Sequence, residues 1–147
     1  MRLSRIVVAL LAAGAATAFA EEPENYIKYR QEMMEAIGGH MGAATQIVRG
    51  KVAPEGHLAM HAKALADLTG DLTVLFPRGS DFGETHAKAE IWDDWAKFEQ
   101  AANQAKDATA GFAAAVAGGD ADAIAAAHKK VGQACKGCHE DFRQKDE

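Results

Sequence analysis

The chain has 147 residues, of which 48% are hydrophobic and 25% are charged, and its formal net charge is −5 at pH 7. This acidic balance argues against proteins that bind nucleic acids or anionic membranes, whose binding surfaces are basic. The length suits one ordinary domain after an N-terminal leader. Abundant Ala and sparse Val, Ile and Thr favour helices over strands.

The first twenty residues have the pattern of a cleaved secretory signal peptide. Arg2 and Arg5 form a basic start, Ile6–Ala13 is an apolar run, and Ala18–Ala20 reads as the small-residue cleavage site. An uncleaved anchor is the less favoured alternative, because a membrane-spanning helix needs about 20 apolar residues. We therefore expect one domain over residues 21–147, exported to the periplasm and not inserted in the membrane after cleavage.

Two helical patterns follow the leader. The first covers residues 23–49, carries an apolar stripe of helical period and stops at Gly50. The second covers residues 54–76, and a loop rich in Gly, Ser and Asp follows over residues 77–85. The connection between these two helices is short, so they should be antiparallel neighbours.

Two further helical patterns complete the chain. The third covers residues 86–117 and stops at Gly118-Gly119, and Asp120 is then the expected N-cap of a fourth helix that runs to about Gln144. Each of the four helices has one apolar stripe. The sequence therefore predicts an all-α, antiparallel up-down-up-down four-helix bundle, whose interior can enclose a flat cofactor between facing helices.

The fourth helix ends in Cys135-Lys136-Gly137-Cys138-His139, the attachment signature of c-type haem. Cys135 and Cys138 share a helix face and can reach two vinyl groups on one porphyrin edge, and His139 can bind the iron. A dithiol redox site is disfavoured because such pairs usually sit at a helix N-terminus. A zinc site would need two more ligands at suitable spacing. We predict one covalently attached haem c.

Met34 is the strongest candidate for the other side of the iron, because His and Met form the common low-spin pair. It lies on the apolar stripe of the first helix, whereas Met33 is about 100° away from it. Two interpretations stay open: the thioether bonds the iron, or Met34 only packs over the haem. His40 is the second candidate for a ligand on this side.

Three more side chains are predicted to lie near the haem. Arg30, one turn before Met34, could pair with a propionate, and Gln31 could donate a further hydrogen bond. The alternative for Arg30 is a solvated side chain at the bundle edge. Arg143 follows His139 by four residues, so it could lie over the imidazole or balance the C-terminal end of the helix.

Two other pairs of residues can be assigned from their spacing. His57 and His61 lie one helical turn apart, but the glutamate of a zinc protease motif is absent, so we expect both near the surface. Trp95 fits the apolar stripe of the third helix. Trp92 cannot face the same way and is expected at a rim or a subunit contact.

The leader, the four helices and the terminal Cys-Lys-Gly-Cys-His-Glu-Asp-Phe-Arg resemble the cytochrome c′ family, the class II c-type cytochromes. The resemblance covers nearly the whole chain after the leader, and it includes Tyr29-Arg30-Gln31 followed by Met34, Leu75-Phe76-Pro77, and Ala89-Glu90-Ile91-Trp92. It implies that Cys135 and Cys138 hold the haem, that His139 is the proximal ligand, that Arg30 and Gln31 lie near the propionates, and that Arg143 lies beside His139. It also implies that a homodimer could form through the first two helices.

The resemblance leaves two functions open, and they differ at Met34. In low-spin relatives a Met at this position ligates the iron and the protein transfers electrons. In cytochrome c′ proper an apolar residue, sometimes Met, covers the sixth site without bonding, and five-coordinate iron binds nitric oxide or carbon monoxide. We take a periplasmic mono-haem electron carrier with His139 and Met34 as ligands, serving an unidentified redox partner, as the leading hypothesis. No distal acid–base pair accompanies Met34, so we expect no enzymatic turnover.

Overall fold

The computed structural model describes residues 22–145 of the chain. The predicted signal peptide and its cleavage site lie outside the described residues. Among residues 22–145, no helix combines the length and the apolar character needed to cross a membrane.

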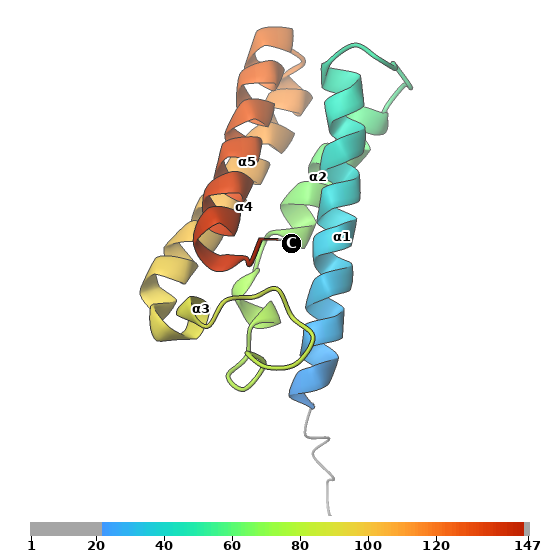
Figure 1. Ribbon diagram of the computed structural model, residues 1–147. Coiled ribbons are helices and arrows are strands. Elements are labelled where there is room, and N and C mark those ends of the chain that lie inside the picture. Colours follow the sequence, from blue (N-terminus) through green and yellow to red (C-terminus); the bar gives the residue numbers. More distant parts are fainter. Residues whose placement is uncertain (1–21, 146–147) are drawn as a thin grey trace, which may run out of the picture.

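Four long helices form the body of the described chain (Figure 1). The elements in order are α1 (Pro23–Val48), α2 (His57–Leu68), the 3-10 turn η1 (Thr73–Leu75), the single-turn α3 (Glu90–Asp93), α4 (Trp95–Gly118) and α5 (Ala121–Phe142). The long helices α1, α2, α4 and α5 alternate in direction along the bundle (Figure 1). The predicted all-α up-down-up-down four-helix bundle is confirmed.

The helices enclose one hydrophobic core. α1 packs on α2, α2 on α4 and α4 on α5, whereas α1 and α5 contact each other more sparsely. Side chains from every long helix fill the centre: Ile37, Ala44, Leu65, Ala105, Phe112, Val131 and Phe142. A buried hydrogen bond of 2.6 Å joins the hydroxyls of Thr69 and Thr109 within this core.

Several helix boundaries follow the predicted punctuation. α1 begins at Pro23, a first-turn position that tolerates the missing N–H. Gly119 adopts the left-handed conformation (φ +77°) that ends α4. The Asp120 carboxylate accepts a hydrogen bond from the backbone N–H of Ala123 at 2.7 Å and caps α5.

Two predicted helices are shorter than the sequence suggested. α2 ends at Leu68, and only the turn η1 follows it. The third predicted helix begins at Glu90 and breaks at Asp94, whose carboxylate accepts a hydrogen bond from the backbone N–H of Lys97 at 3.2 Å and starts α4. Residues 77–89 therefore form a longer connection than expected, and this connection crosses the lower end of the bundle in Figure 1.

The two tryptophans occupy the opposite positions from those predicted. Trp92 is half-buried against the core, and its indole N–H lies 3.1 Å from both the Phe76 and the Pro77 carbonyl oxygens. Trp95 is 36% exposed. The prediction that Trp95 belongs to the core was wrong, because the break at Asp94 changes the helical phase between the two rings.

Candidate functional site

The two cysteines of α5 are free thiols on one helix face. Both side chains are half-buried and pack against the core. In the chain without haem, burial raises the pKa of Cys135, and burial together with Cys135 and Asp141 raises the pKa of Cys138 to about 11. Such thiols are protonated at neutral pH, unlike the acidic thiol of a dithiol redox site.

His139 lies in the last turn of α5, beside the two thiols. Its side chain is exposed, yet partial desolvation and then the charge of Arg143 lower its pKa. A lowered pKa keeps the imidazole neutral, the form that binds a metal. Arg143 ends the helix, and its backbone N–H donates to the His139 carbonyl oxygen at 3.0 Å.

Residues 86–88 lie across the C-terminal end of α5 and pair with it through the backbone. The N–H of Lys88 donates to the Phe142 carbonyl oxygen at 3.0 Å, and the N–H of Gln144 donates to the His86 carbonyl oxygen at 2.7 Å. The last carbonyls of a helix have no partner inside it, so these bonds stabilise its end. No feature of the sequence predicted this contact.

The side chain of Lys88 strengthens the same end of α5. Its ammonium donates to the carbonyl oxygens of Glu140 and Asp141, each at 3.0 Å. The ammonium of Lys97 on α4 pairs with the Asp141 carboxylate at 3.0 Å. The helical turn that carries His139 is thus held by two lysines from other segments.

Arg30 is buried on α1, with 4% of its surface exposed. Its guanidinium donates to the Ser80 hydroxyl (3.0 Å), the Ser80 carbonyl oxygen (2.8 Å) and the Thr85 hydroxyl (2.8 Å), and lies over the rings of Phe76 and Trp92. Burial lowers its pKa. The alternative of a solvated Arg30 is wrong. None of these partners is a carboxylate, so a propionate would suit this buried positive charge.

Gln31 connects α1 to the same loop. Its side-chain amide donates to the Glu84 carbonyl oxygen at 2.8 Å. Arg30 and Gln31 therefore both fix the 77–89 connection against α1, in addition to any contact with a haem.

The predicted ligand on α1 lies at the edge of the core. Met34 is half-buried and packs against core side chains, and so do Met33 and Met41. Burial alone therefore does not separate Met34 from Met33. The second candidate, His40, is engaged elsewhere, because its Nδ1 lies 2.9 Å from Nδ1 of His61 on α2.

The contacts between α1 and α5 define the space beside the motif. The Thr45 hydroxyl lies 3.0 Å from Nε2 of His128, and a Cβ placed on Gly132 would lie 3.9 Å from the Met41 methyl group. A Cβ placed on Gly38 would meet no other atom within 4 Å. Free thiols, a neutral imidazole, open space on α1 and a buried guanidinium together fit a covalently bound haem.

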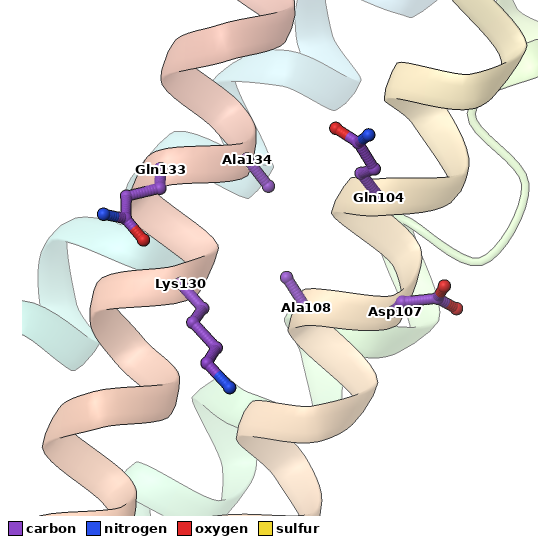
Figure 2. Close-up of a pocket in the computed structure, with 6 residues that line it drawn as sticks. All are labelled: Gln104, Asp107, Ala108, Lys130, Gln133 and Ala134. Atoms are coloured by element: carbon purple, nitrogen blue, oxygen red, sulfur yellow. The ribbon is translucent and has the colours of Figure 1, made fainter.

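A separate groove of about 470 Å³ lies between α4 and α5 (Figure 2). Its lining consists of Gln104, Asp107 and Ala108 from α4 and Lys130, Gln133 and Ala134 from α5. Neither cysteine nor any histidine lines this groove, so it does not coincide with the haem motif.

Comparisons with known proteins agree with the motif and the fold. A sequence profile of the family described as Cytochrome C′ matches residues 25–143. The chain belongs to the cytochrome c′ family. A cytochrome c′ of Pararhodospirillum photometricum is 37% identical over 83% of this chain and 98% of its own length. As a member of this family, the protein is a c-type cytochrome that carries one covalently bound haem c.

Solved structures of the family share the bundle. A nitric oxide complex of a cytochrome c prime variant from Alcaligenes xylosoxidans has a TM-score of 0.79 and 31% identity, covering 86% of this chain and 98% of that one. A carbon monoxide-bound variant of the same cytochrome also has a TM-score of 0.79, with 32% identity, 85% of this chain and 98% of that chain covered.

Proposed function

We propose that this cytochrome binds nitric oxide or carbon monoxide at five-coordinate haem iron, with His139 as the protein ligand and Met34 covering the opposite side without bonding. The observation that carries this proposal is the similarity, over nearly their full length, to variants of a cytochrome c prime in complex with these two gases. It favours the alternative of the sequence analysis over the His/Met electron carrier that was its leading hypothesis.

The register of α1 against α5 supports the assignment of the two sides. The helices are antiparallel, and their contacts pair Thr45 with His128 and Met41 with Gly132. From Thr45 to Met41 the chain goes back four residues on α1, and from His128 to Gly132 it advances four residues on α5. If this register continues along both helices to the haem motif, Met34 lies opposite His139.

The same register gives the haem ring its space. It pairs Cys135 with Gly38, where an added Cβ would meet no other segment within 4 Å, as is also true of Gly39 and Gly42 on the same helix. A glycine opposite the first thioether lets a flat ring approach the α1 backbone. Opposite the motif, α1 would therefore present the small Gly38 beside the edge of the haem ring and the larger Met34 beside the iron.

The roles of the side chains follow from these positions. The haem supplies the iron at which a diatomic gas binds. The neutral imidazole of His139 would hold that iron from α5, and the turn that carries it is fixed by Lys88. Met34, packed on core side chains, would restrict the space open to a ligand on the other side. We propose gas binding without enzymatic turnover.

Electron transfer with His139 and Met34 as ligands is the second candidate. The register that pairs Met34 with His139 also suits a bond between the thioether and the iron. A redox partner protein and a homodimer belong to this proposal as well.

For either function we propose a periplasmic location, which rests on the leader pattern of the first twenty residues and on thioether attachment of haem outside the cytoplasm.

Replacement of Met34 by Ala distinguishes the two candidates. If Met34 only covers the site, the visible spectra of the ferric and ferrous M34A protein stay unchanged, and carbon monoxide binds the ferrous protein about tenfold faster, a barrier lower by ~1.4 kcal/mol. Stopped-flow mixing measures this rate. Met33→Ala is the matched control, because Met33 is also half-buried on α1, and its rate should stay that of the wild type. Conversion from a low-spin to a high-spin spectrum in M34A alone would support ligation and overturn the gas-binding proposal.

A further inference from the structure

A cluster of three histidines lies on α1 and α2, apart from the haem motif. Nδ1 of His40 lies 2.9 Å from Nδ1 of His61, with the two rings at 63°. His57 precedes His61 by one turn of α2, and its ring centroid lies 6.3 Å from that of His61. His40 and His61 are half-buried, whereas His57 is exposed. Neither the haem site nor the gas-binding proposal uses these rings.

We propose that His40, His57 and His61 form a binding site for a divalent transition-metal ion, with copper(II) bound more tightly than nickel(II). Imidazole is a good ligand for both metals, and a given set of nitrogen ligands binds copper(II) more tightly. The groove between α4 and α5 offers no such set of ligands, and the remaining histidines do not cluster with these three.

The contact between the first two rings brings two ligands within reach of one ion. Nδ1 of His40 and Nδ1 of His61 lie 2.9 Å apart in a hydrogen bond. A metal binds imidazole nitrogen at about 2.0–2.1 Å, so one ion can contact two nitrogens that lie about 3 Å apart. A rotation of both rings would turn the two nitrogens from each other toward the ion and replace their hydrogen bond by two bonds to the metal.

His57 supplies the third ligand. Residues four apart on a helix lie on one face, so His57 and His61 can approach the same ion from α2. As the side chains lie now, residues 22–145 contain no group of three or more such ligands close enough to share an ion, so the ring of His57 must turn toward the other two. Its exposure leaves it free to do so.

The electrostatics of the cluster favour the neutral ligand. Desolvation, and then the neighbouring His40 and His57, lower the pKa of His61. At neutral pH His61 is therefore in its neutral form, which has one ring nitrogen able to bind a metal. An ion that joins the three rings would also cross-link α1 to α2 and stabilise the folded chain.

Titration calorimetry of the ferric, haem-loaded protein with nickel(II) chloride and copper(II) sulfate tests the proposal. We expect one ion per chain, with affinity at least 100-fold weaker in His61→Ala and about 10-fold weaker in His57→Ala. His86→Ala is the matched control, an exposed histidine on the 77–89 connection, and should bind like the wild type. The copper(II) EPR signal of the wild type should show splitting by several nitrogens, which His57→Ala reduces.

His57→Ala keeps the test decisive even if His61→Ala folds poorly, because the ring of His57 is exposed and lies outside the hydrophobic core. The proposal is overturned if the wild type binds neither ion, if His57→Ala binds as tightly as the wild type, or if His86→Ala weakens binding as much. The first outcome would leave the His40–His61 contact as a hydrogen bond between α1 and α2 only.

Discussion

The proximal and distal sides of the haem site are held by different kinds of contact. On α5, the two cysteines and His139 lie within five consecutive residues, and Lys88 fixes the carbonyls of the following turn. On α1, Met34 packs against the core, as Met33 and Met41 also do, and no neighbouring residue of the helix repeats its proposed role. Its position depends on the register of α1 against α5 and on the Arg30 network that ties α1 to the loop.

The local part of the function lies on α5. The chemistry of attachment needs only the spacing of residues along one helix, so it survives most changes elsewhere. In the proposed site, the choice between covering and bonding the iron would depend on the placement of α1, which contacts outside the motif set. Substitutions in the motif should therefore have the largest effects, and substitutions on the α1 side should have smaller ones.

The largest effect is expected on the proximal side. Replacement of both Cys135 and Cys138 by Ala should abolish covalent haem, because no other thiol exists in the chain. Intact mass after denaturation measures attachment. The single Cys138→Ala variant is the control and should keep one thioether. A double variant that still carries covalent haem would show that the motif does not attach it.

Arg30 tests how far the distal side depends on long-range contacts. Arg30→Met removes the buried guanidinium and its three hydrogen bonds. Ser80 and Thr85 then lose the guanidinium as a donor. We expect a loss of about 3 kcal/mol in the free energy of unfolding, measured by urea titration. Ser80→Ala, which keeps the guanidinium and the Ser80 carbonyl, should cost about 1 kcal/mol. Equal stability of R30M and the wild type would refute the role of this network.

A smaller effect is expected at the contact between Thr45 on α1 and His128 on α5. Burial and then Arg49 lower the pKa of His128 from its usual 6.5, so the unfolded chain binds more protons below that pH. Stability should be complete above about pH 6.5 and fall as the pH drops through the folded pKa. Urea titrations at several pH values measure this slope.

His128→Gln should flatten that slope without removing it, because His61 also has a lowered pKa and contributes with the same sign. A slope that is the same in H128Q and the wild type would show that the imidazole of His128 is not buried beside Thr45 and Arg49.

The sequence predicted those parts of the fold that short-range signals encode. Pro23, Gly119 and Asp120 mark helix ends whose chemistry is local, and the haem motif is contiguous. The break at Asp94 escaped prediction because the apolar period of the third helix continues across it. Trp92 faces inward since its indole finds the carbonyls of Phe76 and Pro77, a contact that no local pattern reveals.

The candidate site divides in the same way. Cys135, Cys138 and His139 follow from spacing, and Arg30 from its place on an apolar stripe. The pairing of residues 86–88 with the end of α5 could not be predicted, because it rests on two backbone hydrogen bonds between segments more than fifty residues apart. The role of Met34 could not be decided from sequence either, since covering and bonding require the same residue at the same position.

Visible and EPR spectra of the purified wild-type protein in both oxidation states distinguish five-coordinate iron from iron bound by His139 and Met34. The proposed function predicts five-coordinate, high-spin iron in the ferric and ferrous forms, with His139 as the protein ligand. Low-spin spectra typical of histidine and methionine ligation would contradict it and assign Met34 to the iron.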